Sequence, residues 1–220
     1  MLPERPGGGG AEAVHAKAAQ PMSLGMPRSE SDGLAPTASF EAALGQASTL
    51  GRIWMEHWRS LAPVGTLPRR DQLDPTGIPR LLGDMSIMER ERPDLIHLRL
   101  VGTGIVDRIG FDPTGKNIFD VHNYRKHEEV SAHLNFVLDR PCGQIVTLTD
   151  TYSSGRKLTV DICRLPMADR DGVPRYIVAV ARSRFFSALE FIHSEPQIMA
   201  EVMDTTFFTL PGGEPAGLDA

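Results

Sequence analysis

The sequence has no long apolar run, no excess of positive charge and only two cysteines, Cys142 and Cys163. No stretch approaches the ~20 consecutive apolar residues that cross a bilayer, so we expect no membrane-spanning helix. The net charge of -5 argues against a nucleic-acid-binding protein, whose surface is usually basic. The N-terminal residues lack the apolar core of a secretory signal, and the low cysteine content fits a reducing compartment, so a cytoplasmic location is expected.

The sequence also lacks the motifs of common catalytic and metal-binding sites. There is no Gly-x-Ser-x-Gly elbow and no glycine-rich loop ending in Gly-Lys-Ser/Thr, and Ser153-Ser154-Gly155 reads as a hairpin turn. The only local group of histidines is His122, His127 and His133, whose spacings do not place them on one helix face. We therefore expect no catalytic residue, no metal site and no enzymatic activity.

The chain begins with a segment of low complexity and continues with an amphipathic one. Residues 1–38 are rich in Gly, Ala, Pro and Ser, and are predicted to be disordered. Over residues 39–62, apolar residues recur at spacings of three and four, which predicts a helix with Ser39 as its N-cap. Its apolar stripe needs a partner surface, either the chain's own sheet or the same helix of a second chain. The candidate dimer interface consists of Phe40, Leu44, Ala47, Leu50, Trp54 and Trp58.

Residues 63–183 carry the pattern of an α+β domain. Two strands, Asp84–Arg90 and Leu95–Val101, are followed by short helical pieces and by a longer helix over Tyr124–Asp139. Three further strands with Gly-containing turns are predicted within Pro141–Arg182. The residues expected to face inward from the strands are Ile96, Leu98, Leu100, Leu158, Val160, Ile162, Val178 and Val180.

Residues 184–220 are predicted to form a C-terminal extension. The apolar residues between Phe185 and Ile192 are expected to pack against another surface. A short helix is predicted over Gln197–Asp204, and the end of the chain is expected to be disordered. Thr205–Phe208 could dock on a sheet edge or on a partner, and the sequence leaves both open.

Residues 44–183 resemble the PAS domain, and in particular a compact single-domain PAS-like family of alphaproteobacteria. The order and spacing of several short segments carry the resemblance: Trp54 and Trp58, Pro68-Arg69-Arg70, Leu73-Asp74-Pro75, Arg99-Leu100-Val101-Gly102-Thr103 and Thr114-Gly115-Lys116. The resemblance implies a five-stranded antiparallel sheet with helices across one face, preceded here by the amphipathic N-terminal helix. It also implies regulation by ligand sensing or by docking on a signalling protein, and no catalysis.

A bound ligand and a filled core both remain open for such a domain. Haem-binding PAS domains place a histidine on the central helix, so the resemblance makes His127 the candidate haem ligand. If a cavity exists, the polar groups nearest to it are expected to be His127, Tyr124, Asn135 and Thr103. A flavin-adduct photosensor is excluded because neither cysteine lies on the short helical region before the central helix.

These observations predict a non-enzymatic cytoplasmic regulatory protein that forms a homodimer and binds a signalling protein. The alternative is a small-molecule or haem sensor whose ligand switches the geometry of the dimer. A third hypothesis, an enzyme with a cone-shaped α+β fold, would need an acid–base pair on facing cavity walls, and no His/Asp pair falls on predicted inward positions.

Overall fold

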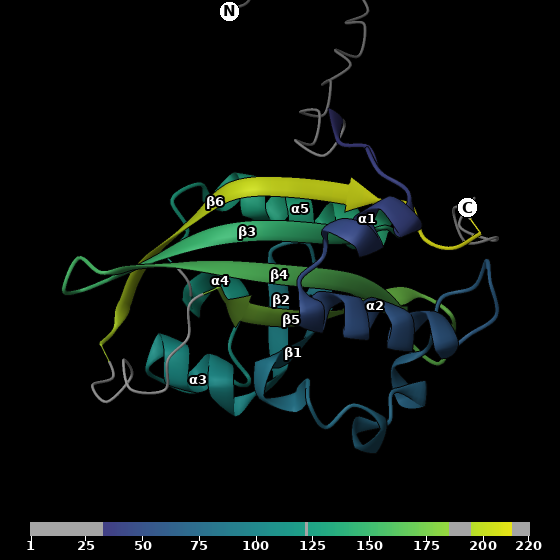
Figure 1. Ribbon diagram of the computed structural model, residues 1–220, viewed down its shortest axis with the longest axis horizontal. Coiled ribbons are helices and arrows are strands. Elements are labelled where there is room, and N and C mark those ends of the chain that lie inside the picture. The colour runs from purple at the N-terminus through teal and green to yellow at the C-terminus, as the bar shows by residue number, and fades with distance from the viewer. Residues whose placement is uncertain (1–32, 122, 185–194, 213–220) are drawn as a thin grey trace, which may run out of the picture.

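A six-stranded antiparallel sheet runs through the structure in the order β2-β1-β5-β4-β3-β6 (Figure 1). The structure is a computed structural model that describes residues 33–121, 123–184 and 195–212. The predictions for residues 1–32, for the apolar residues 185–192 and for residues 213–220 lie outside the described residues. The strands are β1 (Met85–Arg92), β2 (Leu95–Val101), β3 (Gly143–Tyr152), β4 (Lys157–Ala168), β5 (Pro174–Ser183) and β6 (Gln197–Phe208).

The predicted α+β fold is confirmed, and β6 adds a sixth strand to the five that the resemblance implies. The helix predicted over Gln197–Asp204 is wrong, because β6 pairs with β3 along its whole length, from Phe208 opposite Gly143 to Gln197 opposite Tyr152. Without β6, β3 would present a row of unpaired N–H and C=O groups at the sheet edge. The pairing satisfies these groups and overrides the local helix propensity. Thr205–Phe208 therefore dock on the sheet edge.

The amphipathic segment forms two helices, α1 (Phe40–Gln46) and α2 (Thr49–Ser60), where the sequence predicts one. Ser39 caps α1 as predicted, since its hydroxyl accepts a hydrogen bond from the Ala42 amide at 3.2 Å. Ser48 caps α2 in the same way through the amide of Gly51. Ala47, in an extended conformation, separates the helices. A second N-capping serine thus divides the periodic segment.

The apolar stripe of these helices packs against the chain's own sheet. Figure 1 shows α2 in front of the sheet and α5 behind it. Phe40, Trp54 and Trp58 are buried against this face, and the Trp58 indole N–H donates to the Pro166 carbonyl at 2.9 Å. The prediction that these three residues form a dimer interface is therefore corrected. The physical reason is that β4 and β5 present an apolar face that needs a cover. The other three residues, which are only partly buried against the same cluster, are Leu44, Ala47 and Leu50.

The opposite face of the sheet is covered by α3 (Thr103–Ile109), α4 (Ile118–Val121) and α5 (His127–Asp139). Short 3₁₀ turns η2 (Arg70–Gln72), η3 (Pro75–Gly77) and η4 (Leu82–Asp84) lead into β1. Helices therefore lie on both faces, because α1 and α2 cover the face that the resemblance leaves open. Among the described helices, none combines the length and apolar character needed to cross a membrane.

Two inward positions of β5 differ from the prediction. Val178 and Val180 point towards α2, while Ala179 and Ala181 point towards the α3–α5 side. Leu100 of β2 is 37% exposed instead of inward. A strand that is buried on both faces has no polar residues to mark one side, so a register error of one residue exchanges its two faces. The observed register places the small side chains of Ala179 and Ala181 on the α3–α5 side of the sheet and leaves space there.

Candidate functional site

An internal cavity of about 50 Å³ lies between the sheet and the α3–α4 region. Much of its wall is apolar, with contributions from strands and helices: Met88, Leu98, Ile105, Ile118, Leu148, Val160 and Ile162. Five polar side chains, each at least nine-tenths buried, complete the wall: Ser86, Arg108, Tyr124, Asp150 and Arg164. A cavity of this size holds a few water molecules or a small ligand.

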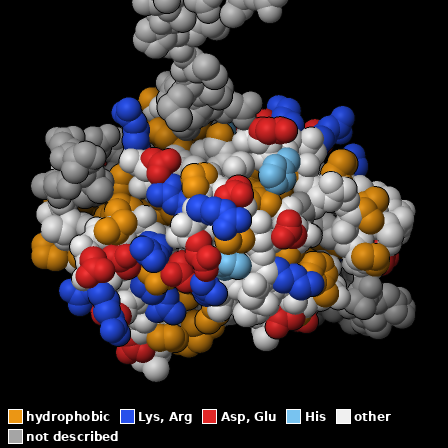
Figure 2. Space-filling view, turned by 180° about the vertical axis from the view of Figure 1, so that it is seen from behind, with side chains coloured by type: hydrophobic (Ala, Val, Ile, Leu, Met, Phe, Trp, Pro, Cys, Tyr) orange, Lys and Arg blue, Asp and Glu red, His pale blue; other side chains and the backbone are white. Residues whose placement is uncertain are grey.

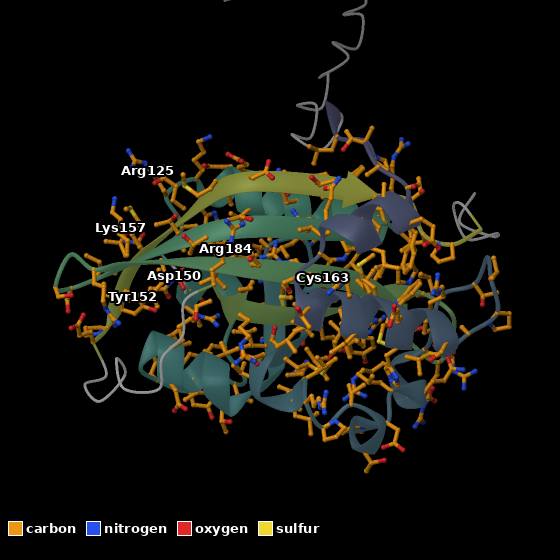
Figure 3. The ribbon with its side chains drawn as sticks, in the orientation of Figure 1. Arg125, Asp150, Tyr152, Lys157, Cys163 and Arg184 are labelled. Atoms are coloured by element: carbon orange, nitrogen blue, oxygen red, sulfur yellow. The ribbon has the colours of Figure 1, made fainter. Side chains whose placement is uncertain are left out.

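The alternation of the strands aims two charged side chains into this cavity. Asp150 continues the inward series Val146 and Leu148 on β3, and Arg164 continues the series Val160 and Ile162 on β4. Figure 3 shows Asp150 and Tyr152 on β3, towards the hairpin end of the sheet. The sheet therefore carries acidic and basic groups where the same periodicity would otherwise place aliphatic ones.

Arg108 and Asp150 form a buried ion pair. The Arg108 Nε lies 3.6 Å from Asp150 Oδ2, and Arg108 Nη1 donates to the Ala181 carbonyl at 3.0 Å. Asp150 Oδ1 also accepts a hydrogen bond from Gln197 Nε2 at 2.6 Å. Burial raises the pKa of Asp150, while the charge of Arg108 and the bond from Gln197 act in the opposite direction. Strand β6 thus contributes directly to the cavity network through Gln197.

Arg164 is buried without an acidic partner in the part of the chain that the structure describes. Its Nη1 donates to Gln144 Oε1 at 2.8 Å, and Gln144 in turn donates to Thr205 Oγ1 at 2.8 Å. Its Nε–H has no hydrogen-bond partner among the described residues. Burial lowers the pKa of Arg164, and nearby Tyr124 opposes that shift. Burial also raises the pKa of Tyr124 to about 12, so its hydroxyl is neutral.

A second hollow, a surface groove of about 340 Å³, lies where η4, the end of β2 and the start of α3 meet. Its lining is mainly apolar and includes Leu82 and Leu100, which are each 37% exposed. Arg70 contributes to the same groove. Val101 lines both the groove and the internal cavity, so the two spaces have a lining residue in common.

The rest of the surface is mixed in charge. Figure 2, which views the molecule from behind, shows acidic and basic side chains intermingled across the middle of that face. Ion pairs along β1 and β2 include Arg99 with Glu89 at 2.6 Å and with Glu91 at 3.0 Å. Exposed pairs of this kind contribute about 0–1 kcal/mol each and mark no binding site.

Comparison with known proteins identifies the domain. A model of the PAS domain family matches residues 47–181, which is more than half of the chain. The chain belongs to the PAS domain family. PAS domains are typically sensor modules of signalling systems rather than enzymes. No curated protein matches the chain.

Several solved structures match part of the chain. The LOV protein of Rhodobacter sphaeroides is 14% identical, with a TM-score of 0.39, over 51% of this chain and 69% of that chain. The light state of the blue-light photoreceptor Aureochrome1 LOV is 14% identical, with a TM-score of 0.38, over 53% of this chain and 91% of that chain. VqmA of Vibrio cholerae is 11% identical, with a TM-score of 0.38, over 50% of each chain. Similarity at this level carries no information about ligand or partner.

The four predicted ligand-binding residues of the PAS domain do not gather in one place. Tyr124 lines the cavity. Thr103 is exposed at the start of α3, where it lines the groove. Asn135 is buried in a different network: its Oδ1 accepts from Arg90 at 3.1 Å, and its Nδ2 donates to the Pro93 carbonyl at 3.0 Å.

His127 is not placed to ligate haem. Its side chain is exposed and its ring lies against Phe119, with the ring centroids 5.0 Å apart. The haem prediction is therefore corrected. Helical periodicity places His127 on the apolar face of the helix. However, His127 is the first residue of α5, and the buried part of the helix begins only at Val130. A cavity of about 50 Å³ is also far smaller than the several hundred Å³ of typical cofactor pockets.

The cysteines lie outside the cavity wall. Cys163 of β4 points to the α2 side, and burial raises the pKa of its thiol to about 12 (Figure 3). Cys142 is buried just before β3 and is likewise a free thiol. Within the described residues, no three His, Cys, Asp or Glu side chains gather as metal ligands, and His122 of the local histidine group lies outside those residues.

Sequence reasoning missed Arg108, Asp150 and Arg164 as site residues. Charged residues in short helices and strands are usually exposed, so sequence reasoning places them on the surface. A signal for two of them was present, because Asp150 and Arg164 fall in the same period-two series as the inward aliphatic residues. Nothing in the sequence marks Arg108, whose burial depends on how α3 packs against β5.

Proposed function

We propose that this PAS domain is a non-enzymatic cytoplasmic regulator that acts by docking on a signalling protein. The observation that carries the proposal is the apolar groove in which Leu82 and Leu100 are exposed. Exposed apolar residues gathered in a hollow are typical of interaction sites, whereas single ones are common anywhere on a surface. The two free cysteines fit a reducing compartment.

The chemistry of the groove indicates what the partner presents. Leu73, Ile78 and Met85 line the groove with aliphatic surface, and Arg70 forms no ion pair with another described residue. A partner segment that inserts an apolar side chain and carries a carboxylate beside Arg70 would match both features. We therefore propose an acidic, amphipathic segment as the docked element.

A second candidate function, sensing of a small molecule, is favoured by the unmatched polar groups of the internal cavity. The segment that joins cavity and groove offers a route for the signal. Val101 lines both spaces, and α3 carries Thr103 at the groove and Arg108 at the cavity. A ligand that moves Arg108 would shift α3 and thereby change the shape of the groove.

The homodimer expected from the sequence stays a prediction. Phe40, Trp54 and Trp58 are used inside the chain, whereas the partly exposed Leu44, Ala47 and Leu50 stay predicted interface residues.

Site-specific photo-crosslinking tests the docking proposal. A photoreactive amino acid at position 100 is expected to capture a partner in cells, and the same group at the 49%-exposed Val173 is the matched control. The purified partner is then titrated calorimetrically against the wild type and Leu100→Asp, with Val173→Asp as control. We expect Leu100→Asp to weaken binding at least about tenfold, equivalent to ~1.4 kcal/mol. Binding that is unaffected by both Leu100→Asp and Leu82→Asp would contradict the proposal.

A further inference from the structure

We propose that the internal cavity binds a short-chain monocarboxylate, whose carboxylate is held by Arg164 and Arg108 and whose alkyl end lies against the aliphatic wall. The inference rests on the second candidate function, small-molecule sensing, and names the chemical class of the ligand. It does not depend on the docking groove.

The charges around the cavity leave one positive charge unmatched. Arg108 faces Asp150 at 3.6 Å, whereas Arg164 forms no ion pair with any described residue and donates only to the neutral side chain of Gln144. A guanidinium stays protonated in proteins, so Arg164 cannot relieve this burial by losing its proton. An uncompensated buried charge is strongly unfavourable, and one bound monoanion would neutralise it.

The hydrogen-bond donors of the cavity are also incomplete. Arg108 and Arg164 are 6% and 4% exposed, and neither Nε–H has a hydrogen-bond partner among the described residues. Both arginines line the same cavity. A carboxylate offers two oxygens with several acceptor positions, so one such group can accept from both arginines at once.

The size and the walls of the cavity limit the ligand further. A buried water needs roughly 10–15 Å³ on the same measure, so about 50 Å³ accommodates a molecule of about four heavy atoms. Acetate has that size, and propionate is one carbon larger. Met88, Leu98 and Val160 provide an aliphatic surface for the methyl end. Inorganic phosphate has no apolar part and would leave this surface without a matching group.

Titration of the full-length protein with acetate and propionate tests the inference. The Nε–H resonances of the arginines are followed by ¹H–¹⁵N NMR at constant ionic strength, and the same samples are titrated by calorimetry. We expect a saturable shift of the Arg164 resonance with a Kd of roughly 0.05–5 mM, given the limited affinity available to so few atoms. Sodium chloride and inorganic phosphate at equal ionic strength should give no saturable shift.

Three variants connect the binding to the cavity. Arg164→Met is expected to raise the Kd for acetate at least tenfold and, without acetate, to keep or raise the melting temperature, because it removes a buried charge. Ala179→Val keeps both arginines and fills part of the cavity beside Arg164, so it should abolish binding even if Arg164→Met does not fold. Arg184→Met removes an exposed arginine paired with Asp161 and should bind as the wild type does.

The outcomes separate the ligand class from the sensing function. No saturable shift in the wild type, an equal response to chloride, or unchanged binding in Arg164→Met would each overturn the carboxylate site. If native mass spectrometry then shows a different bound small molecule, only the ligand class is wrong. If it shows none, the sensing function fails together with the inference, and docking through the groove is still tested by its own crosslinking experiment.

Discussion

His133 is a titratable side chain in the core, on α5. Its ring lies edge-on to Phe207 of β6 at 5.2 Å between centroids, and its exposure is 5%. Burial lowers the pKa of His133 from the ordinary value of 6.5. The charge of Glu129 acts to raise this pKa, and the positive charges of Arg164 and Lys126 lower it further. The folded protein therefore binds this proton more weakly than the unfolded chain does.

We predict that the free energy of unfolding decreases as the pH falls through about 6.5. The unfolded chain gains the proton of His133 first, so stability is present above the unfolded pKa and is lost towards the lower folded pKa. His133→Leu should reduce this pH dependence. Urea denaturation at pH 7.5, 6.5 and 5.5 measures the difference. Burial also lowers the pKa of His57, so some pH dependence of the free energy of unfolding should remain in His133→Leu. A pH dependence equal to that of the wild type would show that His133 does not contribute.

Gly143, at the start of β3, is in close contact with Phe208 of β6. A Cβ at position 143 would lie 2.0 Å from the Phe208 ring, and the ring is fully buried. We predict that Gly143→Ala destabilises the fold by about 1–3 kcal/mol through overpacking. Gly45→Ala, on α1 with nothing within 4 Å, is the control and should be neutral or stabilising.

A double-mutant cycle separates steric conflict from other effects of this change. Phe208→Leu alone should destabilise, but combined with Gly143→Ala it should cost less than the sum of the two single changes. Chemical denaturation gives all four free energies. Simple additivity would mean that the Phe208 ring is not what opposes a side chain at position 143.

Single elements show how far local sequence determines this fold. The alternation of Leu95–Val101 predicts β2 with the bounds that the structure has. The same reasoning assigns Gln197–Asp204 to a helix, because Met, Ala and Glu favour helices locally. Pairing with the edge of β3, which lies about 50 residues away in the sequence, makes this segment a strand instead. The strand at 197–208 therefore cannot be derived without that long-range pairing.

Helix α2 acts as the cover of one sheet face within a single chain. We predict that Trp58→Ala lowers the free energy of unfolding by about 3–5 kcal/mol, since it removes a buried indole. Trp58→Phe keeps most of the packing and mainly loses the hydrogen bond to Pro166, so it should cost less.

Denaturation at two protein concentrations tests the intrachain role of α2. If α2 packs on its own sheet, the midpoint of the wild type should not change over a tenfold range of concentration. A midpoint that rises with concentration would show that folding is coupled to association, as for an interface between two copies.

At the scale of the whole molecule, the cavity and the groove are connected by a tightly packed contact between the start of α3 and η4. The Gly102 amide donates to the Met85 carbonyl at 2.8 Å, and a Cβ at position 102 would lie 2.2 Å from the Leu82 carbonyl oxygen. The start of α3 therefore rests directly on η4, which carries Leu82 at the groove. Because packed elements of this kind move together, a displacement of Arg108 by a ligand should reach the groove.

Methyl NMR of Leu82 and Leu100 during an acetate titration tests most directly whether the cavity controls the groove. The account predicts that both leucine methyl signals shift with the same concentration dependence as the Arg164 Nε–H signal, and that none of them shifts in Ala179→Val. Leucine methyls that stay unchanged while the Arg164 signal saturates would contradict it, because a ligand in the cavity would then leave the docking surface as it was.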